Sequence, residues 1–200
     1  MLGLVDVKKI IVVIAIVYAT ILILLSSGHP VQSGLATLKF AASGAFFLTA
    51  FLFLFVGFLW RLIWRLVPVL GTWLCPDLNG AYKVYIHWIR LIDGEDLTGT
   101  KIAKAYIRQN FITTSIELYS DESESSTLLV LTKKEMGSGR VVLYYIYHNE
   151  PKAGLMINTQ PHKGAAILSI NPDNSKKIEG NYFTDRHTSG RLVMEYEYKL

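Results

Sequence analysis

Two segments near the C-terminus carry aromatic and polar side chains at alternate positions, the spacing that places them on one face of an extended strand. The segments are LYYIYHNEP at 143–151 and GNYFTDRH at 180–187. Tyrosine rings can stack on flat aromatic groups, and an arginine guanidinium pairs well with phosphate. The residues that could do this chemistry are Tyr145, Tyr147, Asn149, Tyr182, Thr184 and Arg186.

A structural alternative explains the same residues: the tyrosines only fill a protein core, and Arg186 lies at its rim in solvent. Gln109 is a further polar residue that alternation places inside, and buried polar groups need partners because leaving them unpaired costs free energy. The sequence leaves open whether a ligand or the protein supplies those partners. The first segment also has a rival face that is nearly its equal, formed by Val142, Tyr144, Ile146 and His148.

The elements that must position these side chains are short strands separated by turn sequences. Segments such as IDGED, NPDNS and HTSG interrupt the alternating runs beyond Pro76. Only the second and third strands lack an obvious turn, so the strand count requires a tight bend near 109–110. The predicted strands are 81–90, 100–108, 110–119, 127–134, 140–149, 162–170, 177–185 and 191–199.

Eight antiparallel strands with short connections predict an up-and-down, lipocalin-like barrel, which has no exposed strand edge and can hold one small ligand. A β-sandwich is the alternative. Alternation predicts two inward faces in the last two strands. They are Ile178, Gly180, Tyr182, Thr184 and Arg186 in the seventh strand, and Leu192, Met194, Tyr196 and Tyr198 in the eighth.

Other chemistry finds little support in the sequence. It lacks the G-x-S-x-G, P-loop, G-x-G-x-x-G and H-E-x-x-H motifs. The five histidines are scattered, and the single cysteine, Cys75, allows neither an intrachain disulfide nor a cysteine-based metal site. We therefore expect no catalytic residues, no metal and no cofactor, and a protein that is not an enzyme.

The N-terminal part is apolar enough to enter a membrane. No formal charge occurs in 10–28 or in 40–60, and about 20 apolar residues are needed to cross a hydrocarbon core as a helix. A signal peptide is the alternative for the first span, but SSGHPVQ is a poor cleavage site. The two spans predict a transmembrane helical hairpin, with Trp60, Trp64 and Trp73 at the position of an interfacial aromatic belt.

The distribution of charge predicts the orientation of this hairpin. The net charge of +4 lies entirely in residues 1–75, which hold five basic residues and one acidic residue, while 76–200 hold fifteen of each. A neutral polar domain argues against DNA or RNA as a partner. Four of the five basic residues flank the hairpin on the side of the termini, so both termini are predicted to be cytoplasmic.

The predicted domain organisation follows from these patterns. Residues 1–60 form the hairpin, 61–76 form a juxtamembrane linker, and 77–200 form a cytoplasmic ligand-binding barrel. Small residues recur every four positions in the second span, at Thr37, Ala41, Ala45 and Thr49, and such a stripe suits helix packing within the hairpin or between chains.

The whole arrangement resembles a known family, the two-transmembrane, β-strand-rich effectors of bacterial CBASS anti-phage systems (CD-NTase-associated, SMODS-associating effectors). The motifs that carry the resemblance are LNGAY at 78–82, IRQNF at 107–111, LYYIYHNEP at 143–151 and GNYFTDRHTSGRL at 180–192. Phe111 departs from the tryptophan expected there, and Gly80-Ala81-Tyr82 has tyrosine in place of the commoner tryptophan.

The resemblance implies that the chain is both receptor and effector. A cyclic di- or trinucleotide, made by a partner CD-NTase, would bind in the barrel, and the chain would then form homo-oligomers and disrupt the bacterial inner membrane in an abortive infection. Transferred onto this sequence, the ligand-binding residues would be Tyr145, Tyr147, Asn149, Tyr182, Thr184 and Arg186, with Gln109 added. The alternative is a membrane-tethered lipocalin-like scaffold that binds an apolar ligand.

Overall fold

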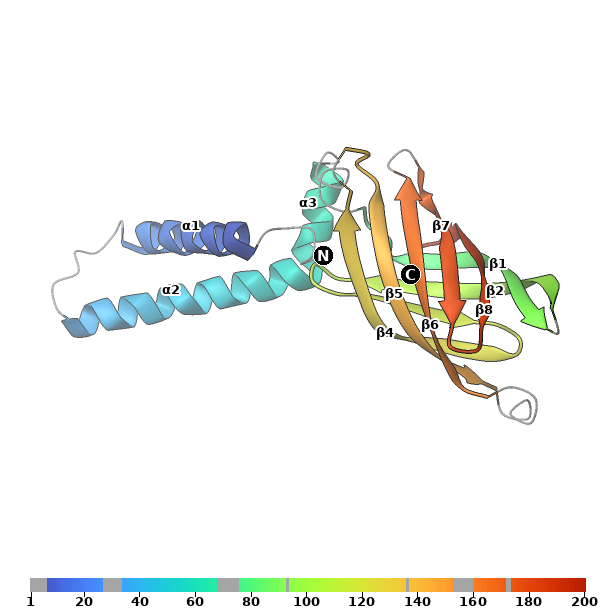
Figure 1. Cartoon of the computed structure of the whole chain (residues 1–200). Helices are drawn as coiled ribbons and strands as arrows, with labels where there is room; N and C mark the ends of the chain where they lie inside the picture. Colours follow the sequence, from blue (N-terminus) through green and yellow to red (C-terminus); the bar gives the residue numbers. More distant parts are fainter. Residues whose placement is uncertain are drawn as a thin grey trace.

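The computed structural model describes residues 7–26, 34–67, 76–92, 94–135, 137–152, 160–171 and 174–200. Helical elements come first along the chain, and strands follow (Figure 1). The helical elements are α1 (Val7–Ser26), α2 (Gly34–Leu54), the π-helical turn η2 (Phe55–Leu59) and α3 (Trp60–Leu66). The strands are β1 (Gly80–Ile92), β2 (Glu95–Gln109), β3 (Thr114–Tyr119), β4 (Ser123–Lys134), β5 (Val141–Pro151), β6 (His162–Asn171), β7 (Asn174–Thr184) and β8 (Thr188–Tyr198).

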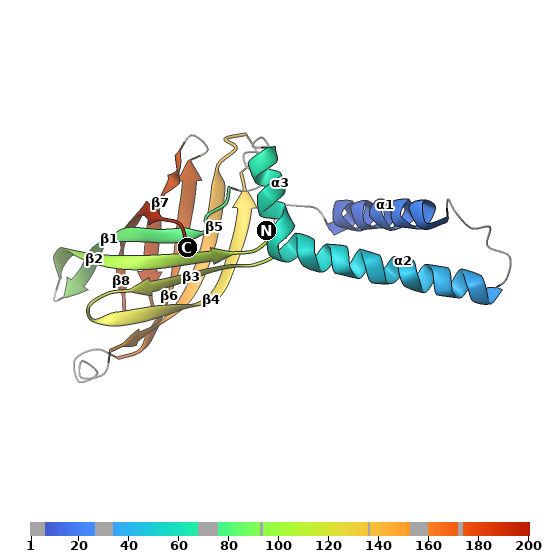
Figure 2. The ribbon, with the colours of Figure 1, turned by 180° about the vertical axis from the view of Figure 1, so that it is seen from behind.

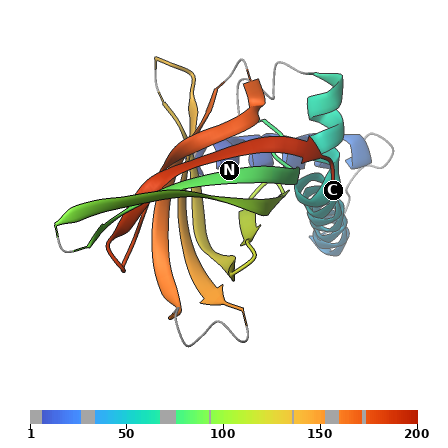
Figure 3. The ribbon, with the colours of Figure 1, turned by 90° about the vertical axis from the view of Figure 1, so that its right-hand side faces the viewer.

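The strands form one closed antiparallel barrel in which each strand pairs with its neighbours in sequence and β1 pairs with β8. This confirms the predicted eight-stranded up-and-down barrel and excludes the sandwich. Closure leaves no edge strand, so every strand pairs with a neighbour on each side along at least part of its length. Figure 3 shows the barrel from its side, with α2 and α3 beside it.

Several strand limits differ from the prediction. β3 begins at Thr114 and not at 110, because the Asn110 side chain makes the missing turn: its Oδ1 accepts hydrogen bonds from the backbone N–H groups of Ile112 and Thr113. β2 begins at Glu95 and β4 at Ser123, whereas the predicted strands begin at 100 and 127, so both strands extend further toward the N-terminus than predicted.

Most inward positions are those that alternation predicts, with Tyr198 as an exception. Leu143, Tyr145, Tyr147 and Asn149 of β5 are buried, which decides against the rival face. On β8 Leu192 and Met194 are buried, but Tyr198 is half exposed, so its predicted inward orientation is wrong. The register between β1 and β8 shifts at Ala81/Tyr82, and the extra residue turns Tyr198 to the outside.

Glycines stand where inward aromatic rings cross a neighbouring strand. Gly164 on β6 pairs with Tyr147, and Gly99 on β2 pairs with Trp88. A Cβ on Gly164 would meet the Tyr147 ring at 2.3 Å, and one on Gly99 would meet Trp88 at 2.6 Å. The absence of a side chain at these two positions is therefore what lets the rings lie over the adjacent strand.

The helices α1 and α2 lie side by side and antiparallel (Figures 1 and 2). The Tyr18 hydroxyl donates to the Ala41 carbonyl at 3.3 Å, and Gly44 is buried where Leu22 approaches. Within the described residues only Ala41–Leu66 is long and apolar enough to cross a membrane, and the apolar helix Ile11–Leu24 is shorter. The structure thus offers one candidate span where the sequence predicted two; Trp73 and residues 27–33 lie outside the described residues.

The end of the long helical segment packs on the barrel. Trp60 and Trp64 are buried in the same apolar core as the barrel interior, so their predicted place in an interfacial aromatic belt is wrong. The Arg61 Nη2 donates to the Gln109 carbonyl at 2.8 Å, and the Phe111 N–H donates to the Val56 carbonyl at 3.2 Å. α3 therefore covers the barrel end that carries the β2–β3 turn.

Candidate functional site

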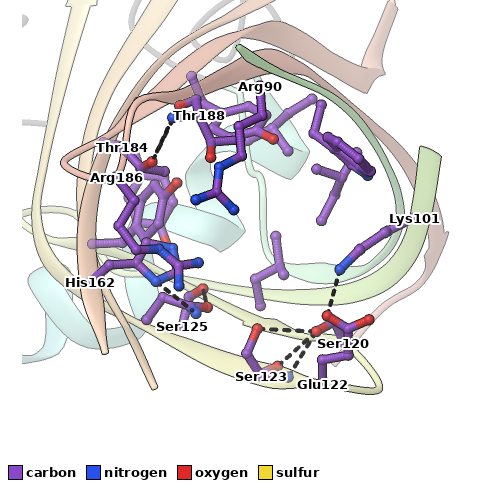
Figure 4. Close-up of a pocket in the computed structure, with 18 residues that line it drawn as sticks. Arg90, Lys101, Ser120, Glu122, Ser123, Ser125, His162, Thr184, Arg186 and Thr188 are labelled. Atoms are coloured by element: carbon purple, nitrogen blue, oxygen red, sulfur yellow. Dashed lines mark hydrogen bonds and ion pairs between the residues drawn. The ribbon is translucent and has the colours of Figure 1, made fainter. Parts of the chain in front are cut away.

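A cavity of about 260 Å³ lies in the barrel at the end opposite α3, among the β1–β2, β3–β4, β5–β6 and β7–β8 connections (Figure 4). Its wall is aromatic and apolar, and its mouth is polar and charged. The residues that line it are Ile86, Trp88, Arg90, Lys101, Leu118, Ser120, Glu122, Ser123, Ser125, Tyr145, Tyr147, Asn149, His162, Tyr182, Thr184, Arg186, Thr188 and Leu192.

Six of the seven residues proposed from the sequence line this cavity together: Tyr145, Tyr147, Asn149, Tyr182, Thr184 and Arg186. Gln109 does not line it. The Gln109 Oε1 accepts a hydrogen bond from the Leu78 N–H at 2.8 Å, and its N–H donates to Asn79 Oδ1 at 2.8 Å. Gln109 thus joins the segment before β1 to the end of β2, at the barrel end that α3 covers.

The tyrosines form the aromatic wall. The rings of Tyr145 and Tyr147 stack with centroids 5.0 Å apart, and the Tyr145 hydroxyl donates to the Ile116 carbonyl at 3.0 Å. Burial raises the pKa of Tyr145 and of Tyr147 well above the ordinary value, and raises the pKa of Tyr182 to about 12. All three hydroxyls therefore remain protonated at neutral pH and can donate hydrogen bonds.

Asn149 lies near the mouth among other polar groups. Its Oδ1 accepts a hydrogen bond from the Ser125 hydroxyl at 2.8 Å, and its Nδ2 lies 3.5 Å from His162 Nδ1. Burial lowers the pKa of His162 below its ordinary value, and the Arg186 charge lowers it further. His162 is thus neutral at physiological pH and lies near the positive charge of Arg186.

The turn between β7 and β8 holds Arg186 over the mouth. The Asp185 carboxylate accepts from the Lys163 N–H at 3.0 Å, and the Asp185 N–H donates to the Lys163 carbonyl at 3.0 Å. His187 closes the turn with a φ of 56°, a conformation that non-glycine residues adopt sparingly. From this position the Arg186 Nη1 donates a long hydrogen bond, 3.3 Å, to the Gln160 carbonyl.

Two more basic side chains reach the mouth, Arg90 from β1 and Lys101 from β2 (Figure 4). Lys101 forms an ion pair with Glu122, whereas Arg90 and Arg186 have no acidic ion-pair partner among the residues that the structure describes. Arg90 and Trp88 are not among the residues predicted from the sequence. The alternation Tyr82, Val84, Ile86, Trp88, Arg90 could have found them, since all five share the inward face of β1.

Comparison with known proteins places the barrel in a family. The sequence model described as "Cap15, cyclic dinucleotide receptor domain" matches residues 73–196, more than half of the chain. The chain belongs to the Cap15 family. A curated relative, CD-NTase-associated protein 15 of Staphylococcus schleiferi, is 29% identical over 138 residues, which are 69% of this chain and 68% of the relative.

Membership of the Cap15 family confirms the resemblance to CBASS effectors. The matched range includes every residue that lines the cavity, so the Cap15 receptor domain and the described cavity are the same part of the chain. In the described part of the chain, no group of three or more His, Cys, Asp or Glu residues could hold a metal ion. The residues that line the cavity can stack on flat aromatic groups, donate hydrogen bonds and pair with anions.

Proposed function

We propose that this Cap15-family chain is a CBASS effector that binds a cyclic dinucleotide in the barrel cavity. The observation that carries the proposal is a pair of arginines, Arg90 and Arg186, over a wall of protonated tyrosines; neither arginine has an acidic ion-pair partner within the described ranges. A cyclic dinucleotide offers two flat bases and two phosphodiester anions. The bases thus match the aromatic wall of the cavity, and the phosphates match the two arginines at its mouth.

Each part of the cavity has a role in this proposal. Arg90 and Arg186 pair with the two phosphates, since a guanidinium matches a phosphate with two parallel hydrogen bonds. Tyr147 and Tyr182 stack on the bases or donate to them, and Asn149 and Thr184 contact base edges. These positions provide the polar partners that a buried ligand requires.

The count of available charges favours a dinucleotide over a trinucleotide. Glu122 already neutralises Lys101, which leaves two arginine charges for the ligand. A cyclic trinucleotide carries three phosphates, so one of them would lack a cation. Four charged side chains at the mouth also disfavour the alternative of an apolar ligand, because burying them against lipid chains would cost free energy without new hydrogen bonds.

We further propose that ligand binding leads to oligomerisation and disruption of the bacterial inner membrane, without catalysis. Ala41–Leu66 is the candidate span, and in this proposal the shorter apolar helix α1, which packs against it, also enters the membrane. In this arrangement both termini and the barrel lie on the cytoplasmic side, in line with the basic residues that flank the helices. The contacts of α3 with the β2–β3 turn attach the receptor to the spanning helix.

Calorimetry tests the receptor role. The full-length chain in detergent is titrated with a panel of 3′,3′-linked cyclic dinucleotides, with a linear dinucleotide and a cyclic trinucleotide as controls. We expect at least one cyclic dinucleotide to bind, and the same compound to cause dye leakage from vesicles that contain the protein. A folded chain that binds no compound of the panel would refute the receptor role, and binding without leakage would refute the effector role.

A further inference from the structure

The outer wall of the barrel over β4–β7 carries an apolar patch that neither the cavity nor the helices use. Strand pairing arranges it in two adjacent rows across four strands. The first row is Leu129, Ile146, Ala165 and Phe183, and the second row is Leu131, Tyr144, Ile167 and Asn181.

None of these eight positions is charged, and the six large side chains among them are 40–59% exposed. Elsewhere the outer wall carries ion pairs, Arg108 with Glu117 on β2 and β3 and Arg191 with Glu179 on β8 and β7. Exposed large apolar residues occur singly on most proteins, but a contiguous group of this kind marks an interaction surface. We name these eight residues the β4–β7 patch.

The β4–β7 patch has the anatomy of a protein interface. Charged residues of both signs border it: Lys163 and Asp185 beside the first row, and Lys133 and Glu179 beside the second. An apolar centre with a polar rim is typical of such surfaces. Six half-exposed side chains of about 200 Å² each present on the order of 600 Å², somewhat less than the roughly 800 Å² per partner of a stable interface.

This size suits partners that are already held close together. A patch of this area alone gives weak association in dilute solution, whereas attachment to one membrane raises the effective concentration of the partners. Figure 1 shows the β4–β7 wall facing the viewer while α2 runs across the picture, and Figure 2 shows the opposite wall. The wall therefore faces sideways from the helix axis, the direction in which another copy in the same membrane lies.

We propose that the β4–β7 patch binds a second copy of this chain, barrel to barrel. The uncharged centre lets two copies of one surface meet without repulsion between like charges, as a twofold symmetric contact requires. This contact lies outside the membrane and is not part of the proposed function. That the patch faces a neighbouring copy does rest on the proposed insertion of the helices into a membrane. It does not depend on which nucleotide binds.

Cysteine cross-linking of the full-length chain in lipid nanodiscs and in proteoliposomes tests the contact. In a Cys75→Ser background, Ile167→Cys lies in the patch, and Ile102→Cys on β2 is the matched control, since the two isoleucines are 52% and 58% exposed. We expect about tenfold more disulfide-linked dimer from Ile167→Cys than from the control in proteoliposomes, corresponding to about 1.4 kcal/mol of preference. Equal cross-linking of both variants overturns the proposal.

A second pair of variants separates this proposal from the receptor role. Phe183→Asp should reduce association of the full-length chain in proteoliposomes about tenfold, while Ile102→Asp leaves association unchanged and both variants bind the cyclic dinucleotide as the parent chain does. If the parent chain binds no cyclic dinucleotide but the Ile167→Cys variant still cross-links, the receptor role is refuted and the contact between barrels is supported. A polarity-sensitive dye attached at the Ile167→Cys position gives a further test. If the dye reports a lipid environment and the same variant forms no cross-linked dimer, the patch contacts the bilayer and the proposal is overturned.

Discussion

Replacing Arg186 with alanine separates a ligand-binding role from a structural one. Arg186 lines the cavity mouth, and its hydrogen bond to the Gln160 carbonyl is long, 3.3 Å. A neutral acceptor at that distance contributes little, so the loss of unfolding free energy should stay below about 1 kcal/mol. For a domain of this size that corresponds to a fall in Tm of less than about 4 °C.

The effect on binding should be much larger. A hydrogen bond to a charged group contributes about 1.5–3 kcal/mol, which corresponds to a Kd raised about 10- to 150-fold. Titration calorimetry of the full-length chain with the best cyclic dinucleotide measures this ratio, and a thermal melt of the same sample measures the stability.

Arg108→Ala is the matched control. Arg108 lies on the outside of β2 in an exposed ion pair with Glu117, a contact of small net energy, so neither Kd nor Tm should change appreciably. An Arg186→Ala chain with the parent Kd would refute the proposed phosphate contact. A large fall in Tm would instead assign Arg186 to the structural role that the sequence left open.

Three other variants test the site and the opposite end of the barrel. His162 has a lowered pKa in the free protein, and a bound phosphate beside it would raise that pKa. Ligand binding should therefore take up a proton, and the Kd should be lower at pH 5.5 than at pH 7.5. His162→Ala should remove this pH dependence of the Kd in calorimetry. Gln109→Ala leaves the buried Leu78 N–H without its acceptor and should cost about 1–3 kcal/mol in denaturant unfolding while the Kd stays unchanged. Gly164→Ala places a Cβ 2.3 Å from the Tyr147 ring, so it should displace that ring and weaken binding at least about tenfold in the same titration, with Gly57→Ala, where the Cβ meets nothing within 4 Å, as control.

The barrel could be predicted because its signal is local. An antiparallel strand with one face in a core alternates along the sequence, and this fixes which residues point inward before any contact is known. The inward faces of β5 and β7 follow from this rule, and with them six of the cavity residues. The choice between the two faces of β5 needed tertiary information, since Tyr144 and Ile146 are as apolar as Tyr145 and become the outer wall instead.

The attachment of the helices could not be predicted from a local pattern. Tryptophans that follow an apolar span are typical of a membrane interface, and the same residues are equally suited to a protein core. Trp60 and Trp64 are buried because the helix turns at η2 and brings α3 across the barrel end, where Phe111 packs against Trp64 with ring centroids 6.1 Å apart. The contact that helps to bury Trp64 thus involves a residue of the β2–β3 turn, far away in the sequence.

The position of Gln109 shows why alternation places a residue inside without giving it a role. Gln109 and Tyr145 both point into the barrel, but the interior of a closed barrel has two ends, and the alternating pattern contains no information about depth. Depth follows from which connection a residue adjoins: Gln109 precedes the β2–β3 turn beneath α3, and Arg186 lies in the β7–β8 turn at the open mouth. In an up-and-down barrel successive turns alternate between the two ends, so the number of turns between two residues predicts whether they can share a ligand. By this rule Arg90 and Glu122 join Arg186 at the mouth, and Gln109 lies at the opposite end, which is where the structure has them.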